Sequence, residues 1–293
     1  MGSPILRWLK RRRWTSIALA VLTLAIIGEA NVLFQKPRLD RNWVENLAVM
    51  PAISLHEDGF SLTKATDWSY DAKGPNRKAY TSASESFVDL KNVWFMVEPH
   101  PGLKPMAHTL VMFEFADDRM IGLTIEARRE EHEKYDALAG AFNAFELAYI
   151  WSTPKDLLTR RAVLLGHEVL VYPLLLGAEQ KHAFLKALLE KTISVSTTPR
   201  FYNTLTSNCT NELAKTAGLS WTYEFVLTGY SAERLHSLNL IPGKSFKVAE
   251  ARARITAKVR EWNGLSTPDF NKALLTELRA RNAAEAATTM PAP

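Results

Sequence analysis

The sequence predicts an α+β fold, because helical and strand patterns both occur but do not alternate in the regular order of a βαβ protein. A β-hairpin pattern near the middle of the chain and separate amphipathic helical patterns after it support this prediction. The 293 residues are 47% apolar and 23% charged, which is typical of a globular protein. This length suits one large domain with appendages.

Strands are expected where short runs are rich in β-branched and aromatic residues. The hairpin has one such run on each side of a short polar turn that begins at Ala116. Residues 35–80 show no regular pattern, so we interpret them as irregular, with Trp43 and Trp68 as packing residues. The predicted strands are residues 93–97, 108–115, 120–126 and 169–172.

Helices are expected where apolar residues recur at a spacing of three and four. One of these helices starts near Cys209, because Ser207 or Asn208 can cap its first turn and Gly218 can end it. The other predicted helices are residues 135–150, 179–189 and 248–262.

The charge distribution argues against a nucleic-acid-binding protein. The formal net charge is +5, but residues 1–13 hold five basic residues and no acid. The remaining chain is therefore neutral and has no concentrated basic face for phosphate binding. The basic segment instead indicates an N-terminal membrane or export signal.

An apolar segment, residues 14–34, follows the basic residues. It predicts an uncleaved signal-anchor whose Arg-rich end lies in the cytoplasm. A cleavable signal peptide is the alternative, with Gly28-Glu29-Ala30 as the cleavage site. Both interpretations export the rest of the chain.

Cys209, the single cysteine, excludes an intramolecular disulfide and any multi-cysteine metal cluster. Its predicted place in the first turn of a helix favours a thiolate, because the free N–H groups and the helix dipole stabilise negative charge. A buried structural cysteine is the alternative. Export favours a functional thiol, because an idle thiol is a liability in an oxidising compartment.

His108 and Glu126 are the candidate base and orienting acid for a cysteine nucleophile. If the hairpin turn has three residues, Phe115 pairs with Arg119, and His108 lies opposite Glu126 on one face. A turn of two or four residues sends Glu126 to the other face. Arg128 could neutralise Glu126 or bind an anionic substrate, or it could be a solvated charge. The sequence has no metal-binding spacing, so no metal ion or other cofactor is expected.

Several motifs in this order resemble the Lnb-type periplasmic domain of Gram-negative bacteria. The resemblance covers roughly residues 85–220 and is most specific around Cys209. The motifs are Val93-Trp-Phe, Ala107-His-Thr109, Phe113-Glu-Phe115, Ile125-Glu-Ala-Arg-Arg-Glu130, Leu147-Ala-Tyr149, Val171-Tyr-Pro173 and Phe201-Tyr-Asn-Thr-Leu-Thr-Ser-Asn-Cys-Thr210.

This resemblance implies a circularly permuted papain-like fold with an antiparallel sheet, similar to lecithin retinol acyltransferase-like enzymes. It implies Cys209 as nucleophile, His108 as base and Glu126 as orienter. Asn208 and Tyr202 are candidates for oxyanion support, with packing as the alternative role of Tyr202, and Arg128 is a candidate for substrate support because it lies near Glu126 in the sequence. The implied reaction transfers an acyl chain from a phospholipid, through a cysteine thioester, to the N-terminal amine of a lipoprotein.

Two other functions remain open. An NlpC-type amidase or peptidase acting on cell-wall peptides would use the same triad, and an apolar rather than a polar site mouth would favour acyl transfer. A non-catalytic envelope module would be favoured if Cys209 were buried far from His108.

The sequence thus predicts a catalytic domain in the periplasm that an N-terminal anchor attaches to the inner membrane. It does not predict an oligomeric state. The predicted regions are a basic cytoplasmic segment (1–13), a transmembrane signal-anchor (14–34), a papain-like catalytic domain (35–245), a C-terminal helical region (246–281) and a disordered tail (282–293).

Overall fold

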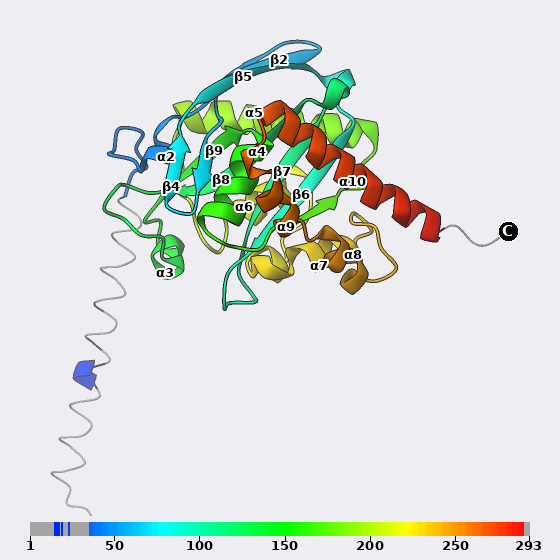
Figure 1. The fold of residues 1–293 in the computed structure, drawn as a ribbon. Coiled ribbons are helices and arrows are strands. Elements are labelled where there is room, and N and C mark those ends of the chain that lie inside the picture. Colours follow the sequence, from blue (N-terminus) through cyan, green and yellow to red (C-terminus); the bar gives the residue numbers. More distant parts are fainter. Residues whose placement is uncertain (1–14, 18, 20–22, 24–34, 290–293) are drawn as a thin grey trace, which may run out of the picture.

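The computed structural model describes residues 15–17, 19, 23 and 35–289 (Figure 1). Most of the predicted signal-anchor, residues 14–34, lies outside the described residues. Within the described ranges, no helix has both the length and the apolar content that a membrane crossing requires.

An eight-stranded sheet forms the centre of the domain, in the order β1-β2-β9-β8-β7-β6-β10, with β5 paired to β2. Its pairings are antiparallel except for a parallel contact between β2 and β9 at Thr66 and Ser152. The strands are β1 (Ala52–Leu55), β2 (Gly59–Thr66), β5 (Tyr80–Ser86), β6 (Asn92–Pro99), β7 (Ala107–Glu114), β8 (Met120–Arg128), β9 (Glu146–Ser152) and β10 (Leu170–Pro173). A separate pair is formed by β3 (Ser69–Asp71) and β4 (Gly74–Arg77).

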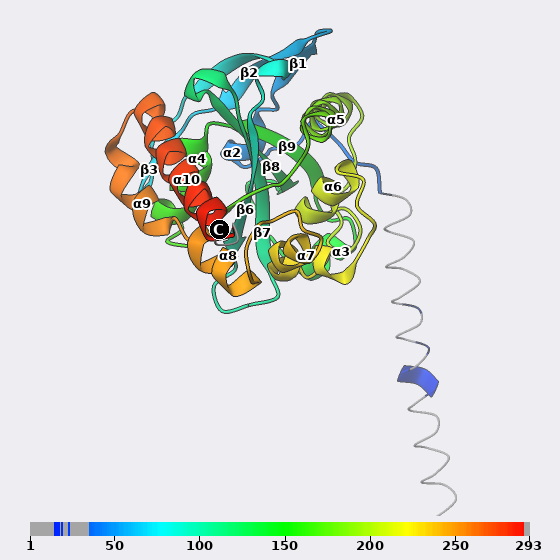
Figure 2. The same ribbon diagram turned by 90° about the vertical axis from the view of Figure 1, so that its right-hand side faces the viewer.

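Helices cover both faces of the central strands, so the α+β prediction is confirmed as a layered arrangement (Figure 2). One face packs against α5 (Ala178–Thr197), α6 (Cys209–Thr216) and α7 (Ser231–Ser237). The other packs against α4 (Pro154–Thr159), α9 (Thr256–Glu261) and α10 (Thr267–Thr289). Val111 and Phe113 of β7 face the first layer, whereas Leu110 and Met112 face the second. This double coverage explains why the central strands are continuous apolar runs.

The β7–β8 hairpin has the three-residue turn that places His108 opposite Glu126. A short 3-10 turn spans Ala116–Asp118, and the Phe115 N–H donates to the Arg119 carbonyl at 2.8 Å. The ladder continues to Leu110 opposite Thr124. The backbone pairing of β7 with β8 ends there, but the side chains of His108 and Glu126 still meet, with His108 Nε2 3.1 Å from Glu126 Oε1.

The prediction of a helix over residues 135–150 is wrong. The chain instead forms α3 (Ala137–Ala141), turns at Asn143 with φ of 58°, and enters β9. All residues of β9 are buried. A strand buried on both faces has no polar alternation, so its apolar run matched helical spacing by chance.

The interpretation of residues 35–80 as irregular is also wrong, because β1 to β4 and the start of β5 lie there, together with α2 (Glu45–Ala48). The paired strands β2 and β5 contain several Ser and Thr residues and are partly exposed, so they lack the apolar signal of core strands. Trp43 and Trp68 are buried, as predicted.

The C-terminal part contains more helix boundaries than the sequence predicted. Residues 248–262 divide into α8 (Phe246–Ala253) and α9, because Arg254 is extended and bridges to Leu170 at the edge of the sheet. Helix α10 continues to Thr289, into the predicted disordered tail. Alanine, which has the highest helix propensity, is frequent there.

Candidate active site

Cys209 is the first residue of α6, as the capping pattern predicted. The Asn208 side-chain oxygen accepts the Asn211 N–H at 2.8 Å and so caps the helix. Gly218 ends the helix region with φ of 72°. Helix α6 packs on β7 and β8, which presents the Cys209 thiol to the strands that carry His108 and Glu126.

The sulfur of Cys209 lies where β7 and β8 separate. The paired ladder ends at Leu110 and Thr124, and beyond it the Thr109 hydroxyl lies 2.8 Å from the Thr210 hydroxyl at the start of α6. The imidazole of His108 lies near enough to the Cys209 thiol for each group to shift the pKa of the other. An interruption of the ladder therefore brings the helix start and the strand end into direct contact.

Glu126 orients the imidazole of His108. The His108 Nε2 lies 3.1 Å from Glu126 Oε1 and 2.7 Å from Thr124 Oγ1. The Thr124 hydroxyl also donates to Glu126 Oε1 at 2.6 Å. Because Nε2 is engaged by these groups, Nδ1 is the nitrogen that can serve the thiol.

The electrostatics of the three groups favour a charged cysteine–histidine pair. Burial lowers the pKa of His108, but Glu126 and the thiolate outweigh this effect and raise it to about 10. Burial raises the pKa of Cys209, whereas His108 and the Thr109 N–H bring it down to about 7. Burial also opposes ionisation of Glu126, yet His108 and Arg161 hold the pKa of this carboxyl well below its usual range. Between about pH 7 and pH 10, the pair is therefore mainly a thiolate and an imidazolium.

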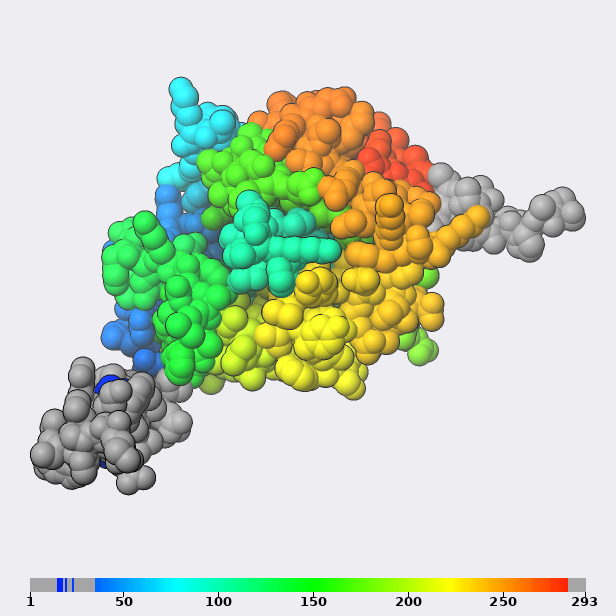
Figure 3. Space-filling model, turned by 90° about the horizontal axis from the view of Figure 1, so that it is seen from below, coloured from blue at the N-terminus to red at the C-terminus, as the bar shows by residue number. Residues whose placement is uncertain are grey.

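Cys209, His108 and Glu126 share the wall of a cavity of about 320 Å³. Segments around residues 100, 135 and 225, which are far apart in the sequence, contribute to this wall and meet on the face shown in Figure 3. One part of its wall is apolar or aromatic and includes Tyr135, Leu165 and Tyr202. Another part is polar or charged, with Glu98, Arg129, Arg160, Arg161 and His167. The cavity can therefore receive a substrate with both an apolar and a polar part.

The predicted supporting residues lie at different places. Tyr202 lines the cavity, and burial and the nearby Cys209 raise the pKa of its phenol well above the usual value, so it remains a hydrogen-bond donor. Asn208 also lines the cavity, but its amide donates to the carbonyls of Thr204 at 2.8 Å and Phe225 at 2.9 Å. This amide has no remaining hydrogen for an oxyanion.

Backbone donors are available beside Cys209. In the described structure, the N–H groups of Cys209 and Thr210 have no hydrogen-bond acceptor, as expected for the first turn of a helix. These groups are positioned next to the sulfur, so they can stabilise negative charge on an oxygen that develops there.

The assignment of Arg128 to the site is not supported by its position. Its guanidinium donates to the carbonyls of Leu47 at 2.9 Å and Ala48 at 2.7 Å and lies over the ring of Trp43. Arg128 is buried and holds the N-terminal segment on the sheet. Arg128 and its two carbonyl partners are about eighty residues apart in the sequence, so the local sequence pattern could not predict this contact.

Arg161, which the sequence analysis missed, neutralises Glu126. Its Nη2 is 3.4 Å from Glu126 Oε1, and its Nε is 2.8 Å from Glu98 Oε2. Glu98 also pairs with His167. The sequence contained one indication of a role for Glu98. Glu98 directly follows the predicted strand 93–97, and the next predicted strand begins at His108.

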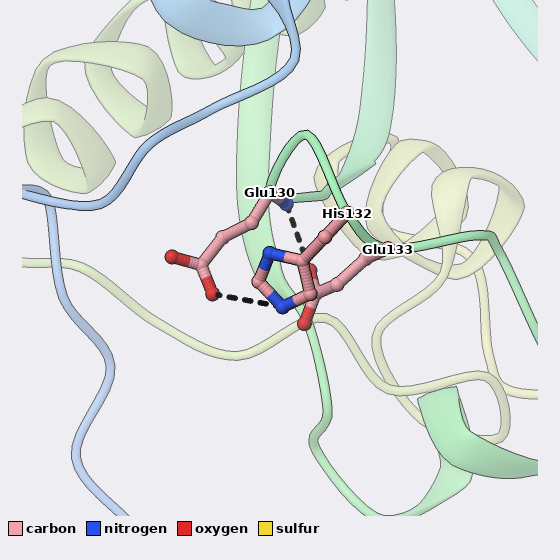
Figure 4. Close-up of side chains that lie close together, drawn as sticks. All are labelled: Glu130, His132 and Glu133. Atoms are coloured by element: carbon pink, nitrogen blue, oxygen red, sulfur yellow. Dashed lines mark hydrogen bonds and ion pairs between the residues drawn. The ribbon is translucent and has the colours of Figure 1, made fainter.

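A separate group, formed by Glu130, His132 and Glu133, could present ligand atoms to a metal ion (Figure 4). The His132 side chain is 77% exposed. The Glu133 carboxylate accepts the backbone N–H of Glu130 at 2.8 Å, and Glu130 pairs with Arg41 at 3.5 Å. These contacts close the loop after β8, and they account for the arrangement without an ion.

The chain belongs to the family of the Lnb N-terminal periplasmic domain, whose family model matches residues 77–224. This range contains Cys209, His108 and Glu126. No curated protein and no solved structure matches the chain.

Proposed function

We propose that the protein is a membrane-anchored periplasmic cysteine acyltransferase. The observation that carries this proposal is that Cys209, His108 and Glu126 line one cavity, with His108 hydrogen bonded to Glu126. We infer a circularly permuted papain-like fold, because the strands with His108 and Glu126 precede the helix with Cys209 in the chain. The predicted signal-anchor at residues 14–34 would hold the site near lipid.

In the first half of the reaction, the Cys209 thiolate attacks the ester carbonyl of a phospholipid. A carbon–sulfur bond forms, the carbon–oxygen ester bond breaks, and His108 gives its proton to the departing alcohol. The N–H groups of Cys209 and Thr210 stabilise the oxyanion, with Tyr202 as a further donor. In the second half, the N-terminal amine of a lipoprotein takes the acyl group from the thioester.

A second cavity supports an acyl substrate. It has a volume of about 240 Å³ and lies along α6, starting at Thr210, the residue after the nucleophile. Its wall is almost entirely apolar, with Phe95, Phe184 and Leu213 among its residues. An apolar space of this size beside the site is suited to hydrocarbon.

An amidase or peptidase acting on cell-wall peptides is the second candidate. The charged side of the catalytic cavity, with Glu98 and Arg129, favours it because a peptide carries both charges. A non-catalytic module is less favoured, because that function predicts a Cys209 buried far from His108, whereas both residues line the same cavity.

Intact-mass analysis of the purified protein with phospholipid tests the proposal. We expect the wild type to gain the mass of one acyl chain and to release lyso-lipid, and Cys209→Ala to do neither. His132→Gln is the matched control, because His132 lies on an exposed loop outside the cavity. If the wild type forms no adduct with phospholipid but cleaves a cell-wall peptide, the amidase is the correct function.

A further inference from the structure

The catalytic cavity contains a second histidine–carboxylate pair. His167 follows the turn after α4, and Glu98 lies at the end of β6; both line the cavity with Cys209. The His167 Nδ1 lies 2.6 Å from Glu98 Oε1. Among the described residues, the His167 Nε2 has no hydrogen-bond partner. A carboxylate that holds Nδ1–H leaves Nε2 as a proton acceptor, which is the arrangement of an oriented base.

Arg161 connects this pair to the Cys209 site. Its guanidinium lies 2.8 Å from Glu98 and 3.4 Å from Glu126, and its side chain is only 4% exposed. The contacts therefore run without a break from His167 through Glu98, Arg161 and Glu126 to His108. Arg161 is thus the shared cationic partner of the two carboxylates that contact the histidines.

Transfer to an amine requires two proton acceptors. An α-amino group has a pKa of about 8, so most of it carries three hydrogens at neutral pH. It must lose one proton before it attacks and another as the amide forms. After the first half of the reaction, His108 is neutral and can accept only one of them. If water instead of an amine accepted the acyl group, His108 would suffice as the only proton acceptor.

We propose that His167, oriented by Glu98, is a second catalytic base that deprotonates the acceptor ammonium group; this inference rests on the proposed function. The ammonium gives its first proton to Nε2 of His167. The nitrogen lone pair then forms the carbon–nitrogen bond, and the carbon–sulfur bond breaks with its electrons passing to the Cys209 sulfur. His108 accepts the second proton from nitrogen, which regenerates the thiolate–imidazolium pair. His167, which is partly exposed, returns its proton to solvent.

The test separates the two half-reactions in the full-length protein. Acylation of Cys209 by a phospholipid is followed by intact mass, and transfer to a synthetic peptide with an S-alkylated N-terminal cysteine is followed by product mass. At pH 7 we expect His167→Gln to lower the ratio of the transfer rate to the acylation rate by about 100-fold, which is typical of a lost general base. Glu98→Gln should change the ratio in the same direction, and His132→Gln is the control.

Two further measurements distinguish a base from a structural residue. Hydroxylamine is uncharged at neutral pH, so transfer to it should be nearly independent of His167. At about pH 9.5, where the peptide amine is already neutral, the defect of His167→Gln should largely disappear. An unchanged ratio, or a loss that is equal for both acceptors and at both pH values, overturns the role of His167. The absence of any Cys209 adduct in the wild type instead overturns the proposed function.

Discussion

At the scale of single residues, the reactivity of Cys209 depends on groups from three elements. Helix α6 supplies the thiol, β7 supplies His108 and the Thr109 N–H, and β8 supplies Glu126. Burial alone would keep the thiol neutral. The opposing charge of His108, which Glu126 stabilises, is therefore the decisive interaction.

Alkylation of Cys209 by iodoacetamide should report this ion pair. Because the pKa of Cys209 is about 7 and that of His108 about 10, thiolate accumulates as the pH rises through 7. We expect the rate to rise with a midpoint near pH 7, below the value of about 8.5 for an ordinary cysteine.

The variant His108→Ala removes the imidazolium but leaves the thiol buried. The midpoint of alkylation should therefore move upward, beyond that of an ordinary cysteine. A midpoint that stays near 7 in this variant would show that the helix start and the Thr109 N–H are enough to lower the pKa of Cys209 without His108.

Arg128 and Arg161 show why residue roles were only partly predictable. The hairpin register placed Glu126 beside His108 because both lie on adjacent strands, where local spacing decides which side chains meet. The arginine partner of Glu126 comes from the segment after α4, and Arg128 is covered by the chain near Leu47. Such contacts between distant segments have no local pattern.

At the scale of elements, the start of α6 is fixed by Asn208. This side chain caps the helix and donates to the carbonyls of Thr204 and Phe225. The Asn211 amide also donates to Phe225. Together these bonds fasten the helix start to the preceding loop and to the segment after it, and they hold Cys209 in place.

The change Asn208→Ala should destabilise the protein by about 2–4 kcal/mol, because it removes a helix cap and two buried hydrogen bonds. Urea unfolding measures this difference. Ser245→Ala is the matched control, since Ser245 caps α8 at an exposed position and should cost only about 1 kcal/mol. Equal costs for the two variants would contradict the additional role of Asn208.

The element predictions succeeded where short-range chemistry decides the structure. The cap of α6 and the three-residue hairpin turn both follow from adjacent residues. Residues 146–152 were mistaken for helix because β9 is paired to β8 and buried on both faces. In such a strand, tertiary burial replaces the polar alternation by which a strand is recognised.

At the scale of the whole molecule, α10 holds the hairpin that carries the site. Arg279 of α10 donates to the buried carboxylate of Glu114 at 2.9 and 2.7 Å and to Asp118 at 2.8 Å. Glu114 also accepts hydrogen bonds from Asn92 and Trp94. The C-terminal helix is thus joined to the end of β7 opposite His108.

We expect Arg279→Ala to lower the free energy of unfolding by about 1–3 kcal/mol, because the buried Glu114 loses its cationic partner. The partial exposure of Arg279 limits the effect. Lys272→Ala, at an exposed position of the same helix, should change stability by less than about 0.5 kcal/mol. A comparable loss in both variants, measured by thermal unfolding, would argue against the contact.

The sequence by itself determined the α+β class, the helix start at Cys209 and the register that faces His108 with Glu126. Each depends on residues close together in the chain or on two strands joined by one short turn. Only the tertiary structure decided that Arg161 neutralises Glu126, that Arg128 is buried elsewhere, and that His167 and Glu98 share the cavity with Cys209. The physical reason is that packing of both sheet faces by helices brings together charged side chains whose contacts leave no periodic trace in the sequence.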